Sequence, residues 1–287
     1  MEKSAILLSF LSLWLISYLN SNYLEALGFV LILTFGILHG TNDILIYKTM
    51  NKENHSTKKI LIYYIGAIAT IISLLYFFPM LALILFTCIS AYHFGEQYWL
   101  TTSKIETLKN KFVTYFSSGG TILFLLIYLQ YEESNKIIYA ITQKNIAELY
   151  IQYILIMFLL IYSATLIRNF NTSQTKISIG YHLFHLLVFY IIFKVSNLIW
   201  GFTIFFIFWH SLPSLESQIK FIYGEVTGIT IYRYLRKGII YWGFSIVGLI
   251  AVYIYYEDIV NLNSLIFSFL TAITFPHVFV ISKMFRK

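Results

Sequence analysis

The chain alternates between apolar runs and short polar segments along its whole length. The polar segments include KTMNKENHSTKK, TTSKIETLKNK and RNFNTSQTK, and the runs between them are about 17–25 residues long, enough to cross a bilayer as helices. We therefore expect an all-α fold, a polytopic integral membrane helix bundle of about 8–10 transmembrane helices. A single transmembrane domain is expected over residues 1–287. The expected helices cover roughly residues 5–20, 23–47, 59–78, 80–100, 112–131, 147–167, 178–195, 198–222, 238–256 and 262–284.

Composition and charge agree with a membrane protein. Hydrophobic residues make up 59% of the chain and charged residues 11%, whereas a soluble domain carries about 25% charged residues. The net charge of +7 comes from Lys and Arg in short loops, where they act as topology signals, so nucleic acid is not an expected partner. Cys88 is the only cysteine, which excludes a disulfide framework and a thiolate metal cluster.

The loop charges predict an orientation in the membrane. With the N-terminus in the cytoplasm, every Lys and Arg except Lys136, Lys144 and Lys194 falls on the cytoplasmic side. The acidic pairs Glu132–Glu133 and Glu257–Asp258 then lie outside. We expect a multi-pass protein of the cell (inner) membrane with both termini cytoplasmic. No small-x-small cleavage site follows the first apolar stretch, which favours a retained helix over a signal peptide.

The histidines lie at similar depths in these runs, and only His55 is in a polar stretch. His39, His93, His210 and His277 occupy helices that are expected to run from outside to inside, about 12–16 residues, or roughly 18–24 Å, below the outer end. Ionisable residues inside a membrane are costly and are functional candidates by default. A shared depth is what a single metal site would require.

Two of these histidines are followed by a carboxylate. In GILHGTND, Asp43 comes one turn after His39, so both are expected on one helix face, where Asp43 could orient the imidazole. The alternative is a packing face made by Gly36 and Gly40, with a core histidine. In SAYHFGEQ, Glu96 follows His93 by three residues; the alternative is a pair of interfacial polar residues.

Two other histidines are accompanied by proline. In WHSLPSLE, Pro213 is expected to kink the helix or free carbonyls near His210, and Glu216 could contact a neighbouring imidazole. In FPH, Pro276 is expected to interrupt the run just before His277, with no carboxylate nearby in the sequence. In both places the alternative is a packed core histidine.

A third group is His182 and His185, which are three residues apart and so share one helix face. They enter from the cytoplasmic end of their run and reach nearly the same depth as the other four histidines. The pair could bind metal or lie near the membrane interface.

An all-imidazole set of ligands suits Fe, Cu, Zn or Ni. A site within the membrane favours a lipid-soluble substrate, and dioxygen also concentrates in hydrocarbon. These properties favour an oxygen-using iron enzyme that acts on a lipid, without selecting it over a copper or haem protein. Hydrolytic zinc is less attractive because no His-Glu-x-x-His helix is present.

The motifs GILHGTND, SAYHFGEQ, FWHSLPS and FPH, in this order, resemble the bacterial and archaeal Brp/Blh-type β-carotene 15,15′-dioxygenase family over residues about 30 to 280. The resemblance implies an integral membrane oxidoreductase that splits β-carotene symmetrically with O2 and gives two molecules of all-trans-retinal. Fe(2+) is the implied cofactor. The retinal product often supplies a rhodopsin in the same cell.

The resemblance also implies a ligand set. By position, His39, His93 and His210 match the iron ligands of the family, and no catalytic residue beyond the metal ligands is implied. Members used to define the site carry a second histidine four residues after the one in the Trp-His-Ser motif, and this chain has Ser214 there.

The fourth ligand is therefore open. His277 is the first candidate because it shares the depth and helix direction, and His182 or His185 is the next. Water completing a three-histidine site is a further alternative. Two other functions remain possible from the sequence: a metal or proton transporter that uses the intramembrane histidines with Asp43 and Glu96, and another lipid-modifying membrane oxidase.

Overall fold

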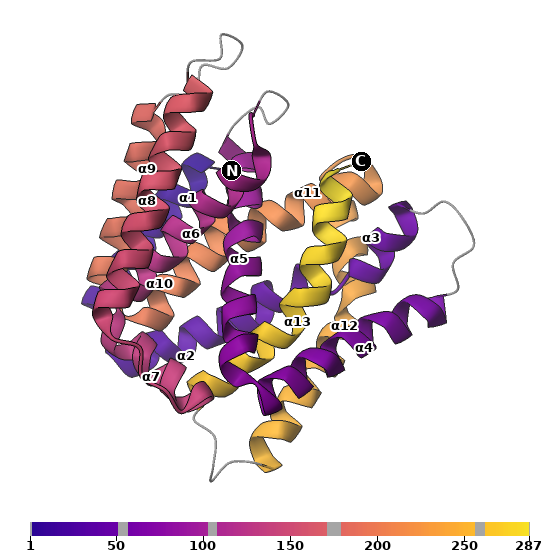
Figure 1. The fold of residues 1–287 in the computed structure, drawn as a ribbon. Coiled ribbons are helices and arrows are strands. Elements are labelled where there is room, and N and C mark those ends of the chain that lie inside the picture. Colours follow the sequence, from indigo (N-terminus) through magenta and orange to yellow (C-terminus); the bar gives the residue numbers. More distant parts are fainter. Residues whose placement is uncertain (1, 51–56, 103–107, 171–178, 256–261, 287) are drawn as a thin grey trace. The chain divides into compact units, whose positions relative to one another are not determined.

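A computed structural model describes residues 2–50, 57–102, 108–170, 179–255 and 262–286 (Figure 1). His55 and the pair Glu257–Asp258 lie outside these residues. Every element in the described part of the chain is helical. The elements are α1 (Glu2–Trp14), η1 (Leu15–Ser17), α2 (Ser21–Leu31), η2 (Ile32–Gly36), α3 (Asp43–Met50), α4 (Thr57–Phe77), α5 (Pro79–Thr102), α6 (Lys111–Leu129), α7 (Tyr131–Thr142), α8 (Glu148–Phe170), α9 (Ile179–Val195), α10 (Leu198–Ile204), η4 (Phe205–Ser211), α11 (Leu212–Tyr223), α12 (Gly228–Tyr255) and α13 (Leu262–Phe285).

The predicted class, an all-α polytopic membrane bundle, is confirmed. Within the described residues, 7 helical segments are long and apolar enough to cross a membrane. They correspond to seven of the ten expected runs. The segments are Lys58–Phe77, Pro79–Thr101, Lys111–Leu129, Glu148–Phe170, Leu198–Tyr223, Gly228–Ile254 and Leu262–Phe285.

The other three expected runs form shorter helices. The first is α1 followed by the 3₁₀ turn η1, and the expected run at 178–195 is α9, with 17 residues. The expected continuous helix at 23–47 is wrong, because residues 39–42 form a turn between η2 and α3. Gly40 and Thr41 favour this break, since glycine weakens a helix and the Thr41 hydroxyl donates to the Leu38 carbonyl at 2.8 Å.

Several helices begin at an asparagine or a proline. The side chain of Asn20 accepts from the Tyr23 N–H at 3.1 Å at the start of α2, and that of Asn197 accepts from the Trp200 N–H at 2.8 Å at the start of α10. Pro79 is the first residue of α5, where its missing N–H costs nothing. The expected interruption at Pro276 is not seen, because α13 continues through it.

The chain forms two compact units. Unit 1 comprises Met1–Ile32, Ser90–Lys136 and Asn145–Pro213, and unit 2 comprises Leu33–Ile89, Ile137–Lys144 and Ser214–Lys287. The single transmembrane domain over 1–287 stays a prediction.

Unit 1 is held by close helix crossings. In Figure 1, α6 and α8 lie side by side, and Phe124, Ile151, Leu155 and Phe158 form the core between them. A Cβ at Gly95 of α5 would overlap the Tyr115 carbonyl of α6, and one at Gly119 would overlap the Ala91 carbonyl. These glycines therefore let the backbone of α6 approach α5 on both sides of His93.

Unit 2 is built around α13, which packs on α4, α3 and α12. Ile46, Met50, Val280, Ile281 and Met284 form a buried cluster between α3 and the end of α13. The packing brings the 39–42 turn close to the middle of α13, which is the region that carries His277.

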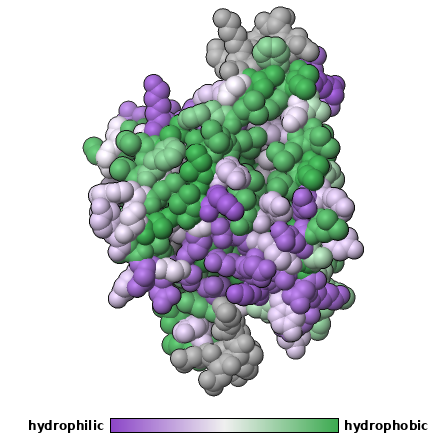
Figure 2. Space-filling view, turned by 90° about the vertical axis from the view of Figure 1, so that its left-hand side faces the viewer, coloured by the Kyte–Doolittle hydropathy of each residue, from purple (hydrophilic) through white to green (hydrophobic). Residues whose placement is uncertain are grey.

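Apolar side chains also cover the outside of several helices. Figure 2 shows one face on which hydrophobic residues predominate over a broad area. Helix α8 alone exposes a row of large apolar side chains, including Tyr150, Tyr153, Met157, Leu160 and Ile167. Such surfaces are what helices in contact with lipid tails present.

Candidate metal centre

Unit 1 brings together two buried imidazoles, those of His93 of α5 and His210 of η4. Their ring centroids are 4.7 Å apart and their planes are nearly perpendicular. Both side chains are almost fully buried. Phe206 stacks on the His210 ring at 5.5 Å, and Phe94 meets it edge-on at 4.8 Å. The two imidazoles therefore lie in an aromatic, apolar part of the unit.

His210 lies in a π-helical turn. The Leu212 N–H donates to the Ile207 carbonyl five residues back, the spacing that defines such a turn. Pro213 follows immediately and has no N–H to offer to the turn before it. The expected local distortion near His210 is therefore present, as a widened turn. Single π-helical turns in α-helices are frequent at functional sites.

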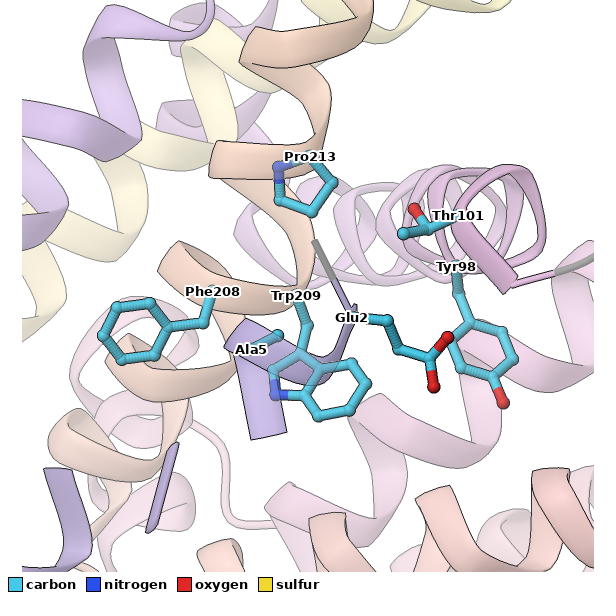
Figure 3. Close-up of a pocket in the computed structure, with 7 residues that line it drawn as sticks. All are labelled: Glu2, Ala5, Tyr98, Thr101, Phe208, Trp209 and Pro213. Atoms are coloured by element: carbon cyan, nitrogen blue, oxygen red, sulfur yellow. The ribbon is translucent and has the colours of Figure 1, made fainter. Parts of the chain in front are cut away.

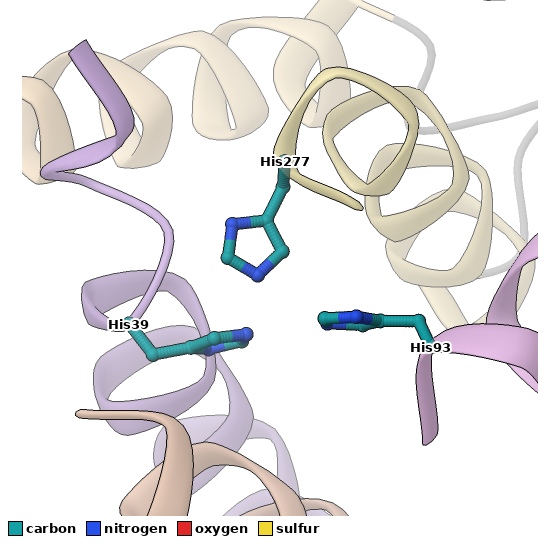
Figure 4. Close-up of side chains that lie close together, drawn as sticks. All are labelled: His39, His93 and His277. Atoms are coloured by element: carbon teal, nitrogen blue, oxygen red, sulfur yellow. The ribbon is translucent and has the colours of Figure 1, made fainter. Parts of the chain in front are cut away.

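Unit 2 contains a second pair, His39 and His277. Their ring centroids are also 4.7 Å apart, with an interplanar angle of 90°, and both are buried. In Figure 4 the His277 ring projects from α13 toward the His39 ring; His93, drawn in the same figure, belongs to unit 1. Both pairs include a histidine at or near a π-helical turn. His39 comes three residues after η2, and His210 lies within η4.

A carboxylate orients the imidazole of His277. Its Nδ1 lies 3.0 Å from each oxygen of Asp43, and the Tyr64 hydroxyl donates to Asp43 Oδ2 at 2.8 Å. Because the carboxylate accepts from Nδ1–H, the lone pair of the ring is on Nε2. Metal-binding histidines commonly donate their other ring N–H to a carboxylate in this way.

The Asp43 contact corrects one prediction and supplies a residue pair that sequence reasoning missed. Asp43 does not share a helix face with His39, because the 39–42 turn separates them and Asp43 begins α3. Its partner is His277, which is 234 positions away in the sequence. Local spacing carries no signal for such a pair, because no carboxylate is near FPH in the sequence.

A hydrogen-bonded network supports the 39–42 turn. The Asn42 side chain donates to the Tyr234 carbonyl at 2.9 Å, and the Tyr234 hydroxyl donates to Gln218 Oε1 at 2.5 Å and lies 3.4 Å from the His39 carbonyl. Gln218 Nε2 in turn donates to Ser214 Oγ at 2.9 Å. Ser214, where a histidine was expected from the resemblance, is therefore part of a buried network that reaches the backbone of His39.

Helix α12 approaches this turn closely at Gly238. A Cβ there would overlap Thr41 Oγ1 and lie 2.9 Å from Asn42 Nδ2. We expect Gly238→Ala to lower the free energy of unfolding by about 1–3 kcal/mol, since overpacking a tight contact costs this much. Thermal unfolding in detergent measures it. Gly243→Ala, on the same helix with nothing within 4 Å, is the matched control and should be neutral or stabilising. Equal melting temperatures for the two variants would contradict the close approach.

The two other acidic candidates have described partners of their own. Glu96 is buried and accepts a hydrogen bond from Tyr92 at 3.0 Å within α5. Glu216 is partly exposed and forms an ion pair with Lys220 at 3.8 Å, a contact typical of surface side chains. Of the three acidic candidates, Asp43 lies against an imidazole, that of His277. The roles of Glu96 and Glu216 beside a metal ligand stay predictions.

His182 and His185 belong to a different hydrogen-bonded cluster within unit 1. The Tyr98 hydroxyl lies 2.8 Å from His182 Nδ1 and 3.1 Å from His185 Nδ1, and the Tyr162 hydroxyl lies 3.1 Å from His182 Nδ1. His185 Nε2 pairs with Glu2 at 3.1 Å. Both ring nitrogens of His185 and Nδ1 of His182 are thus used in hydrogen bonds.

A small pocket borders this cluster (Figure 3). It lies between α1, the end of α5 and the region around Trp209, and in Figure 3 the Glu2 side chain extends toward the Tyr98 ring. Its size suits a water molecule and not a polyene. The lining residues are Glu2, Ala5, Tyr98, Thr101, Phe208, Trp209 and Pro213.

Comparison with known proteins identifies the family. Residues 30–285 match the family described as beta-carotene 15,15′-dioxygenase. No curated protein and no solved structure matches the chain. The matched region covers most of the sequence and contains both histidine pairs and Asp43. The resemblance seen in the motifs is confirmed, and the chain belongs to the beta-carotene 15,15′-dioxygenase family.

Proposed function

We propose that this protein is an iron-dependent dioxygenase that cleaves β-carotene at its central 15,15′ double bond with O2 and gives two molecules of all-trans-retinal. The observation that carries the proposal is the family match over residues 30–285. Membrane-spanning helices support it, because β-carotene partitions into hydrocarbon. Buried imidazole pairs support it as well, because they are a donor set that accepts iron.

We further propose His39, His93, His210 and His277 as the ligands of one iron ion. The donor set fits iron(II), because neutral imidazoles suit this ion and all four side chains are buried. Asp43 supports the inclusion of His277, since it holds Nδ1 protonated and leaves the lone pair on Nε2. Hydrogen bonds use both ring nitrogens of His185, which argues against His185 as the fourth ligand.

The reaction balances without an external reductant. The central double bond breaks, and each of the two carbon atoms that it joined receives one atom of the same O2 molecule, so both products are aldehydes. Bound iron would supply the activation of dioxygen. The protein then has to hold the polyene and exclude water, and Phe94 and Phe206 beside His210 provide an apolar surface for both tasks.

The setting in the cell is also part of the proposal. We place the protein in the cell (inner) membrane with both termini in the cytoplasm, on the loop charges. β-Carotene would enter from the lipid bilayer, and the retinal released there is available to a rhodopsin in the same membrane.

The orienting role of Asp43 has a measurable consequence. We expect Asp43→Asn to lower iron affinity about 10–100-fold, as loss of such partners does at other metal sites. Tyr64→Phe removes the hydroxyl that donates to Asp43 Oδ2 and should have a smaller effect, because the carboxylate remains beside His277. Iron titration of the purified variants measures both affinities. An Asp43→Asn protein that binds iron like wild type would remove Asp43 from this role.

The function is tested by expressing the chain in a bacterial host that makes β-carotene. We expect the orange cells to become pale and to accumulate retinal. The His55→Ala variant, changed at a histidine expected in a polar loop, should behave in the same way. Unchanged β-carotene in cells that contain folded, iron-loaded protein would reject the dioxygenase proposal and favour a transport function for the buried histidines.

A further inference from the structure

Helix α1 is outside the region that matches the family, yet it packs on and is hydrogen-bonded to the part of unit 1 that contains His210. The family match begins at residue 30, and α1 spans Glu2–Trp14. Within unit 1, α1 packs on η4 and on α9. Neither the family nor the proposed ligand set assigns a role to this helix.

The contacts of α1 with these elements are specific hydrogen bonds. The indole N–H of Trp209 donates to Ser9 Oγ at 3.0 Å, and that of Trp200 donates to the Ser12 carbonyl at 3.1 Å. Ser9 is fully buried, in a helix whose sequence is otherwise strongly apolar. A hydroxyl at such a position is costly unless it is hydrogen-bonded, so the bond to Trp209 accounts for it.

Trp209 directly precedes His210 in the π-helical turn. Its ring meets Phe189 edge-on at 4.7 Å and His185 at 5.1 Å. Its position is therefore fixed by α9 on one side and by Ser9 on the other. A shift of Trp209 would move the adjacent His210 with it, since the two residues share a peptide bond.

The turn needs such an anchor because its own backbone bonding is weakened. A π-helical turn is rare on its own, and Pro213 cannot donate a hydrogen bond to the carbonyl four residues before it, that of Trp209. Side-chain contacts must therefore hold the turn in place. One of these contacts is the hydrogen bond from the Trp209 indole to Ser9, which links the residue next to His210 directly to α1.

We propose that Ser9 is a positioning residue, which fixes Trp209 by its hydroxyl group and thereby sets the orientation of the His210 imidazole. The proposal rests on the proposed function, because it assumes that His210 binds the metal. It gives α1 a role in the geometry of the metal site without direct contact with the substrate.

A double-mutant cycle on the full-length protein tests this role. The variants are Ser9→Ala, Trp209→Phe and the two combined, each removing one or both partners of the same hydrogen bond. Ser12→Ala is the matched control, because the Trp200 indole bonds to the backbone carbonyl of Ser12 and keeps that bond. Ser9→Thr retains a hydroxyl and serves as the conservative variant.

The readouts are the visible absorption spectrum of cobalt(II) bound in place of iron, and retinal formation at saturating iron. We expect Ser9→Ala and Trp209→Phe to change the cobalt spectrum in the same way and to lower kcat about 10-fold with little change in KM, because a small displacement of a ligand affects the reaction more than binding. The combined variant should be no worse than either single one. Ser12→Ala and Ser9→Thr should resemble wild type.

The outcomes separate this inference from the proposed function. A wild-type protein that binds metal but makes no retinal would reject the dioxygenase proposal, while the cobalt spectra would still report on Ser9. A wild-type protein that binds no metal would overturn both. If wild type is active and Ser9→Ala matches Ser12→Ala in spectrum and kcat, or if the effects of Ser9→Ala and Trp209→Phe simply add, Ser9 does not position His210.

Discussion

Replacing His93 or His210 with alanine is expected to abolish retinal formation, lowering it by more than about 100-fold, because loss of a residue that merely orients a ligand already costs 10–100-fold. The two imidazoles lie 4.7 Å apart in an apolar part of unit 1, where water is a poor replacement for a missing ligand. Iron content should fall with activity in both variants. Retinal formation by detergent-purified protein, normalised to folded protein, measures the effect.

A variant next to His210 controls for the effect of disturbed packing around the two imidazoles. Phe206→Leu alters the ring stacked on His210 but leaves both imidazoles in place. We expect it to keep its iron, even if its rate falls. Full iron content in His93→Ala and in His210→Ala would show that this pair does not bind the metal, whatever happens to activity.

His277→Ala carries the second large expected effect. We expect it to lose iron and retinal formation together, because the proposed fourth ligand is removed and Asp43 is left buried without its imidazole partner. Metal analysis of the purified protein and a retinal assay on the same sample measure both. Melting temperature should fall as well, since the Asp43–His277 bond links α3 to α13.

His182→Ala provides the comparison for the alternative ligands. Its Nδ1 lies within hydrogen-bonding distance of the Tyr98 and Tyr162 hydroxyls, so we expect the variant to lose stability and to keep its iron. If instead His277→Ala binds iron like wild type and His182→Ala does not, the fourth ligand has been assigned to the wrong helix. Loss of iron in neither variant would favour a three-histidine site completed by water.

Most of the helices could be predicted from hydrophobic run lengths, because a membrane requires about 20 apolar residues per span. The boundaries at Asn20, Pro79 and Asn197 follow from local capping and proline chemistry. The break at 39–42 was missed, because the residues around it are apolar enough to continue a span. Its stability comes from tertiary partners, Tyr234 and Gly238 on α12, which are distant in the sequence.

The candidate residues were also found from the sequence, since a histidine in an apolar run is conspicuous by its cost. Their partners were not. The carboxylate beside His277 comes from Asp43, and the hydroxyls beside His182 come from α5 and α8. Such pairings depend on how helices pack, and spacing within one helix says nothing about them. The π-helical turn at His210 could be predicted in part. Pro213 indicates that the helix is distorted near His210, but it does not indicate that the distortion is a π-helical turn.

The most direct test of the dioxygenase proposal is the origin of the oxygen atoms in the product. Purified, iron-loaded protein is given β-carotene under ¹⁸O2, and retinal is reduced at once to retinol, because an aldehyde oxygen exchanges with water. The proposal predicts ¹⁸O in essentially every retinol molecule and two retinal molecules for each O2 consumed. Retinol in which about half of the molecules carry oxygen from water, or β-carotene left intact by the iron-loaded protein, would contradict it.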